Sequence, residues 1–79
     1  MKARVLFFGA TAEAVGKREI EIDLARQTKA DDVFAQILTI YPQLKRYSLL
    51  FAVNQEYLNG KEIINEGDEL AVFTAVSGG

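Results

Sequence analysis

The only long helical pattern in this 79-residue chain covers residues 30–41. Its apolar residues recur at the three- and four-residue spacing of an amphipathic helix. They are Val33, Phe34, Ile37, Leu38, Ile40 and Tyr41. Residues 28–31 resemble a capping box that would begin the helix. Pro42 would end it, because the residue before a proline is displaced from helical geometry. A helix with one apolar face must bury that face on another layer, and the rest of the chain offers strands for this purpose.

Strand-like segments make up most of the remaining sequence. They lie at residues 3–8, 19–24, 49–53 and 69–73, with a fragment at 57–58. Residues 61–64 should bring Ile63 and Ile64 back toward the core. The first and last segments are the most apolar, so we expect them side by side and parallel at the centre of the sheet. Residues 19–24 alternate apolar side chains with acids, which predicts an edge strand with its carboxylates in water.

Residues 11–15 predict a single turn of helix between the first two strands, with Thr11 as its N-cap and Gly16 after its end. Such a short helix must lean on the sheet. The order of elements predicts an α+β fold, with a mixed sheet of about four to five strands packed on one main helix.

Several classes of chemistry are excluded by residue types that the chain lacks. It contains no cysteine and no histidine, so it has no thiolate nucleophile, no disulfide and no imidazole base or metal ligand. We expect no metal site, since a solvated strand face explains Glu19, Glu21 and Asp23 better than a bound cation does. No nucleophile, base and orienting group can be assembled into a stand-alone active site.

The charge and hydropathy patterns bear on partners and location. Nine basic and eleven acidic residues give a net charge of −2, which disfavours nucleic acid as a partner. No apolar stretch approaches the roughly 18 residues of a membrane span, and the N-terminus lacks the apolar region of a signal peptide. We therefore expect a cytoplasmic protein with no membrane partner.

Residues 74–79 form a tail whose side chains shrink toward Gly78 and Gly79. Glycines have no Cβ, so they let a backbone enter a narrow channel, and the extended tail would span about 20 Å. Considered alone, the pair fits either a functional end or a frayed terminus. We expect one domain over residues 1–79 with a flexible tail from 74 to 79.

Four short motifs resemble a known family over nearly the whole chain. They are Val-Leu-Phe-Phe at 5–8 with the short helix after it, Ala-Val-Asn-Gln at 52–55, Gly-Asp-Glu-Leu-Ala at 67–71 and Val-Ser-Gly-Gly at 76–79. In this order they resemble the sulfur-carrier small subunits of molybdopterin synthase, which have the ubiquitin-like β-grasp fold. That family commonly has two prolines where this chain has Thr74 and Ala75. Because these prolines are missing, the chain could instead be the related thiamine-pathway sulfur carrier. The insertion at residues 9–17, however, is similar to that of the molybdopterin synthase subunits.

The resemblance implies a sulfur-donating subunit of a sulfurtransferase complex, without activity of its own. A ubiquitin-activating-like adenylyltransferase would adenylate Gly79 with ATP, and a sulfur donor protein would help convert it to a thiocarboxylate. Gly78, Ser77 and Val76 would lie in the channel of the large subunit, where the sulfur passes to a pterin precursor. The chain has no phosphate-binding loop, so we expect ATP to be used by the partner and no cofactor to be bound here.

A docking surface for the large subunit is also implied, in a heterotetramer of two small and two large subunits. Aromatic residues at the positions of Phe8 and Phe73 contact the large subunit in the family, and Thr74 and Ala75 adjoin them. From the residues alone, both aromatics fit either an interface or the core. Two other functions stay open, namely a ubiquitin-like modifier joined to other proteins and an interaction module with an incidental tail.

Overall fold

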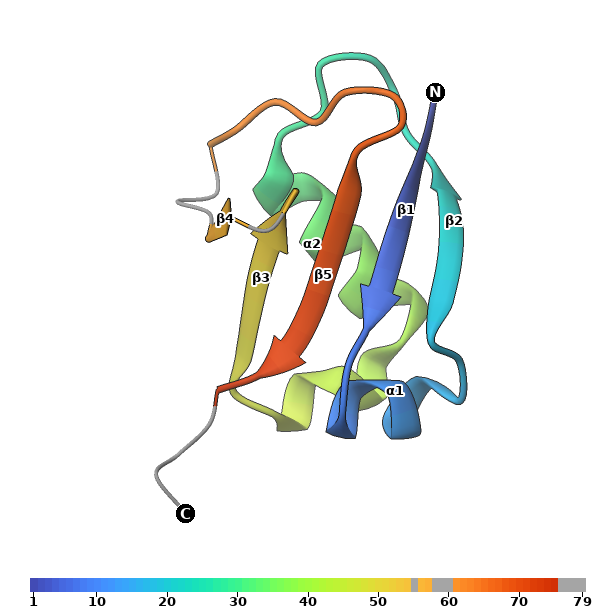
Figure 1. Cartoon of the computed structure of the whole chain (residues 1–79), viewed down its shortest axis with the longest axis vertical. Coiled ribbons are helices and arrows are strands. Elements are labelled where there is room, and N and C mark those ends of the chain that lie inside the picture. Colours follow the sequence, from blue (N-terminus) through green and yellow to red (C-terminus); the bar gives the residue numbers. More distant parts are fainter. Residues whose placement is uncertain (55, 58–60, 76–79) are drawn as a thin grey trace.

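A five-stranded mixed sheet with one long helix behind it forms the fold (Figure 1). The computed structural model describes residues 1–54, 56–57 and 61–75. The strands are β1 (Lys2–Phe7), β2 (Glu19–Asp23), β3 (Leu49–Val53), β4 (Glu56–Tyr57) and β5 (Glu69–Thr74). The helices are α1 (Ala10–Val15), α2 (Ala30–Ile40) and the 3-10 helix η1 (Pro42–Arg46). These elements confirm the predicted α+β class.

The first and last strands lie side by side at the centre, as predicted. The spatial order is β2-β1-β5-β3-β4, and β1 runs parallel to β5 in a register that pairs Val5 with Leu70 and Phe7 with Val72. β2 pairs antiparallel with β1 and occupies the sheet edge, which confirms the prediction from its alternating pattern. The face of β1 and β5 that α2 covers has to be apolar, and on it Val5, Leu70 and Val72 are fully buried.

α2 covers one face of the sheet and supplies much of the core. Val33 and Ile37 are fully buried, at the spacing that the sequence pattern predicts. The ring of Phe34 stacks on that of Phe51 with 3.8 Å between the centroids, which joins the helix to β3. Both phenylalanines therefore belong to the packing between α2 and the sheet.

The predicted helix N-caps are both wrong. Lys29 is the N-cap of α2 and makes no side-chain capping bond, whereas the Thr28 hydroxyl donates to Ala25 O at 2.6 Å. Thr11 lies inside α1, whose N-cap is Gly9. The predicted ends are correct, because Gly16 closes α1 in the left-handed conformation with φ 82°, and α2 stops at Tyr41 before Pro42.

Several strand boundaries differ from the sequence prediction. β1 runs from Lys2 to Phe7 instead of 3–8, and β2 ends at Asp23 instead of Leu24. Of the two isoleucines expected in the core, Ile64 is buried, but the prediction for Ile63 is wrong, because its side chain is 45% exposed where its backbone forms an isolated bridge with Lys29. The predicted fragment at 57–58 is seen as β4, and position 58 lies outside the described residues. β5 continues through Thr74, one residue beyond the predicted end.

No helix in the described ranges is long and apolar enough to cross a membrane.

Candidate docking face and tail

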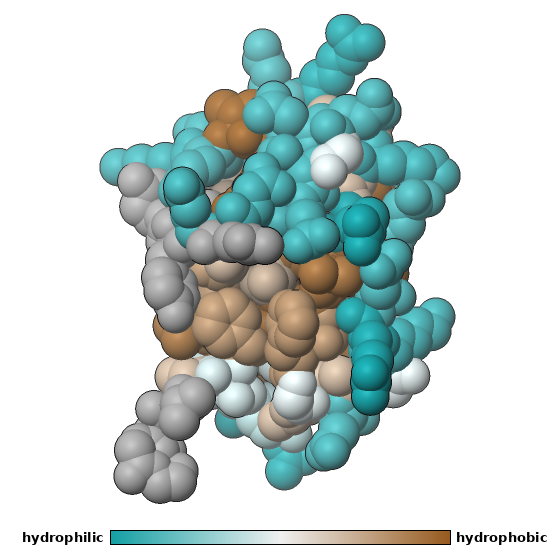
Figure 2. All heavy atoms as spheres, in the orientation of Figure 1, coloured by the Kyte–Doolittle hydropathy of each residue, from teal (hydrophilic) through white to brown (hydrophobic). Residues whose placement is uncertain are grey.

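The sheet face opposite α2 carries an apolar surface. Figure 2 shows brown, apolar atoms in the middle of this face, with teal, hydrophilic side chains above and to the right. Alternation along β1 and β5 turns Val5, Phe7, Leu70 and Val72 toward α2, so the residues between them face outward. We define the apolar patch as Leu6, Phe8, Leu50, Ala71 and Phe73, which the strand registers bring together across β1, β5 and β3.

The two aromatic residues proposed as docking contacts both lie in the apolar patch. Phe8 follows the end of β1 and is 50% exposed, so it is not a core residue. Phe73 lies opposite Leu50 in the β3–β5 pair and is partly buried. An exposed phenylalanine beside other apolar side chains is typical of a protein contact surface.

Thr11 fixes the end of β1 against β5, a role that the sequence did not indicate. Its hydroxyl accepts a hydrogen bond from Phe8 N at 3.0 Å and lies 2.8 Å from both Phe8 O and Val72 O, either of which can take its proton. Among the described residues it is the only buried polar side chain. Thr11 thereby holds the backbone of Phe8 next to the strand that leads to the tail.

β5 leads directly from the apolar patch toward the C-terminal residues. Thr74 pairs with Leu49, and Ala75 N donates to Ser48 O at 2.9 Å. The sequence analysis placed Thr74 and Ala75 in the tail, whereas the structure pairs both with the chain at the start of β3. Val76, Ser77, Gly78 and Gly79 lie outside the described residues.

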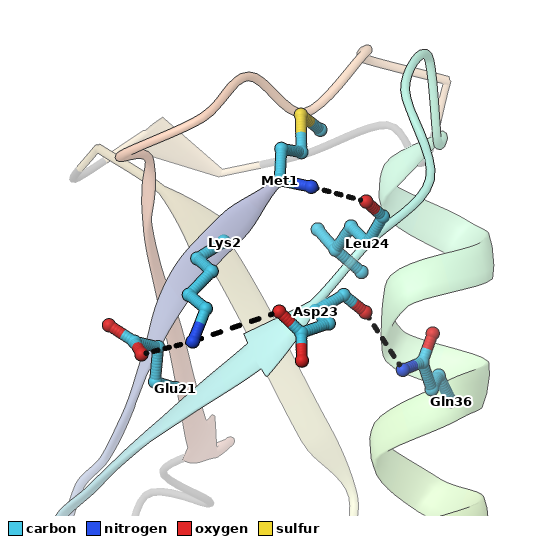
Figure 3. A network of polar contacts seen from close by, with 6 residues as sticks. All are labelled: Met1, Lys2, Glu21, Asp23, Leu24 and Gln36. Carbon is cyan, nitrogen blue, oxygen red and sulfur yellow. Dashed lines mark hydrogen bonds and ion pairs between the residues drawn. The ribbon is translucent and has the colours of Figure 1, made fainter.

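Charged side chains cover the part of this face next to β2 (Figure 3). Lys2 Nζ lies 3.3 Å from Glu21 and 3.9 Å from Asp23, and Gln36 of α2 donates to the Asp23 carbonyl at 3.5 Å. These residues couple the edge strand to both β1 and α2.

Arg4 makes a second set of ion pairs on the same face. Its guanidinium lies 3.0 Å from Glu19 and 3.8 Å from Glu69. The hydrogen bond and negative charge of Glu19, with a smaller contribution from Glu69, hold the pKa of Arg4 above its usual range. The carboxylates of β2 are thus partners of basic side chains, and no group of three or more ligands within residues 1–54, 56–57 and 61–75 could hold a metal ion.

Known proteins resemble the chain over its full length. The ThiS family model matches residues 5–79. The molybdopterin synthase sulfur carrier subunit of Chlamydomonas reinhardtii is 35% identical over 83 residues, which cover 100% of both chains. Among solved structures, SAMP1 of Haloferax volcanii, a small archaeal modifier protein, is 26% identical with a TM-score of 0.88, and the match covers 100% of each chain.

A further solved structure shares the fold at lower identity. It is a complex of subunits 1 and 2 of the molybdopterin-converting factor from Helicobacter pylori, in which the matching chain is 23% identical with a TM-score of 0.72 and both chains are covered completely. The structural likenesses confirm the ubiquitin-like β-grasp fold that the sequence motifs predict.

Proposed function

The chain belongs to the ThiS family, and from that premise we propose that it is a sulfur carrier and the small subunit of a molybdopterin synthase. The observation that carries the proposal is the continuity of β5. This strand contributes Phe73 to the apolar patch and then runs through Thr74 and Ala75 into the last four residues. A protein seated on the patch would therefore meet the tail at the edge of the same contact.

Gly79 is the proposed sulfur carrier. Its carboxylate is a poor electrophile, so adenylation with ATP comes first, carried out by a ubiquitin-activating-like adenylyltransferase in the cytoplasm. Sulfide-level sulfur from a donor protein then attacks the acyl adenylate and displaces AMP, and the Gly79 carboxylate becomes a thiocarboxylate. That partner proteins carry out the adenylation and supply the sulfur agrees with a sequence that contains no phosphate-binding loop, no histidine and no cysteine.

The proposed acceptor site lies in the large subunit, within reach of Ala75. Because Ala75 is hydrogen-bonded to Ser48, the four residues after it can span at most about 14 Å when extended. Val76, Ser77 and Gly78 would line the channel, with Gly78 leaving room for the backbone. Thr74 and Ala75 would sit at its mouth, beside contacts made by Phe8 and Phe73. Two such small subunits would bind two large subunits.

Intact mass of the purified chain tests this proposal. The chain is incubated with ATP, a sulfur donor and the activating enzyme of the same organism, beside a variant that lacks Gly79. We expect the full-length chain to gain the mass difference between sulfur and oxygen, and the variant to gain nothing. Absence of the gain, with an activating enzyme that is competent on another carrier, would contradict the proposal.

The sulfur acceptor is tested in a second reaction. The charged chain is mixed with the large subunit and a pterin precursor, and we expect the added mass to disappear as a dithiolene product forms. Sulfur that moves instead to a thiazole precursor would assign the chain to the thiamine pathway.

A ubiquitin-like modifier is the second candidate, and the likeness to SAMP1 favours it. A modifier would join Gly79 to lysines of other proteins. Detection of higher-mass conjugates in cells, and their loss when Gly79 is deleted, would identify this activity.

A further inference from the structure

A hollow of about 750 Å³ adjoins the apolar patch at the end of the sheet where α1 lies. It is bounded by the end of β1, by α1 and by the connection that leads into β2. Leu6 and Phe8 line the hollow and also belong to the apolar patch, so the two surfaces are continuous. A protein that covers the patch would therefore cover the hollow too.

Two basic side chains on the rim of the hollow have no partner in the described part of the chain. Lys17 and Arg18 line the hollow, are exposed, and take part in no ion pair or side-chain hydrogen bond with any described residue. The hollow also contains Glu13, which is likewise unpaired, and Glu19, which Arg4 engages at 3.0 Å. Two basic and two acidic residues therefore line the hollow, and because Arg4 engages Glu19 from outside the lining, the unpaired side chains among the described residues leave one positive charge in excess.

The rest of the same face has the opposite charge balance. Along the rest of β2, the carboxylates of Glu21 and Asp23 share one basic partner, Lys2. The docking face is therefore anionic along its β2 edge and cationic at the α1 end, with the apolar patch beside both. Such a charge pattern favours one orientation of a docked protein over its reverse.

We propose that the hollow receives an acidic side chain of the molybdopterin synthase large subunit, with Lys17 and Arg18 as its partners. The inference rests on the proposed function. A protein that covers the apolar patch removes water from these two cations, and a desolvated cation without a counter-charge is costly. The large subunit is the partner that holds the tail during sulfur transfer, so its surface has to supply the carboxylate.

Charge reversal with a matched control tests the proposal. The Lys17→Glu/Arg18→Glu double variant is compared with the Arg26→Glu/Lys29→Glu double variant. The second variant makes the same change in net charge, but in the connection between β2 and α2. Affinity for the large subunit is measured by calorimetry at low and at physiological salt. Replacing attraction by repulsion at a partly buried pair should weaken binding about tenfold in the first variant, and the control should change it less than about twofold. The difference should shrink as salt increases.

A second pair of measurements separates this proposal from the function on which it rests. If the wild-type chain does not bind the large subunit, the proposed function fails and this proposal fails with it. If the wild-type chain binds and the two double variants bind equally, only this proposal fails. A loss confined to adenylation by the activating enzyme would also overturn it. Recovery of affinity when one acidic residue of the large subunit is changed to lysine would support it.

Discussion

Replacing Thr11 by valine should loosen the junction between β1 and β5 while keeping the shape of the buried side chain. The hydroxyl accepts from Phe8 N and shares its proton between Phe8 O and Val72 O. Each of these backbone groups keeps another partner, because Phe8 N also donates to Val72 O at 3.2 Å and Phe8 O also accepts from Thr11 N at 3.2 Å. Thr11→Val therefore leaves no buried group without a hydrogen bond.

The expected cost follows from that count of partners. A hydroxyl can accept one bond and donate one here, and each is worth about 0.5–1.5 kcal/mol. We expect the free energy of unfolding to fall by about 1–2 kcal/mol, since the larger penalty of an unpaired buried group does not apply. For a domain of this size, that corresponds to a drop of roughly 5–15 °C in Tm.

Thermal unfolding and amide exchange measure the two consequences separately. Thr11→Ser keeps the hydroxyl and loses one buried methyl group, which costs about 0.8 kcal/mol, so its stability falls by a similar amount. The Phe8 amide distinguishes the variants, because its exchange should accelerate in Thr11→Val and stay near that of the wild type in Thr11→Ser. A Thr11→Val protein with wild-type stability and wild-type exchange at Phe8 would refute the reasoning.

Four further substitutions address the patch, the core, the strand end and a turn. Phe8→Ala should weaken binding to the large subunit by about thirtyfold in calorimetry while barely changing Tm. Phe34→Ala, in the core, should lower the free energy of unfolding by about 3–5 kcal/mol in denaturant. A large loss of stability in Phe8→Ala, with unchanged stability in Phe34→Ala, would contradict these assignments. Ala75→Pro removes the donor to Ser48 O, so unfolding should become about 1 kcal/mol easier, and an unchanged midpoint would show that this bond contributes nothing. Gly16→Ala forces a side chain into φ 82° and should lower stability by about 1 kcal/mol in the same assay, which an unaltered Tm would disprove.

Local patterns were enough to predict much of the fold. The spacing of Val33 and Ile37 predicted α2, and Pro42 predicted its end. The first and last strand-like segments are the most apolar in the sequence, and this predicted that β1 and β5 pair at the centre of the sheet. Each of these signals is carried by residues close together in the sequence.

Features that depend on distant partners could not be predicted in the same way. Thr11 resembles an N-cap, yet its hydroxyl bonds Val72, a residue 61 positions away. Thr28 also resembles a cap, but the nearby Ala25 carbonyl competes for its hydroxyl. Phe8 fitted core and surface equally well, and only the course of the chain after β1 shows that its ring is half exposed. The hollow likewise requires the fold, since the pairing of β1 with β2 brings Lys17 and Arg18 next to Leu6 and Phe8, with Phe7 N donating to Arg18 O at 2.8 Å.

The position of β5 has a consequence for how the protein is made. Among the described residues it is the last strand in sequence, yet it lies in the sheet between β1 and β3 and pairs with both of them. During synthesis, β1 to β4 emerge first and have no central strand on which to assemble, so folding waits until residues 69–74 have left the ribosome. A prematurely terminated chain that lacks them would stay unfolded and open to proteolysis. Because β5 precedes the glycine pair in the sequence, any molecule that carries Gly79 also carries the strand that completes its sheet.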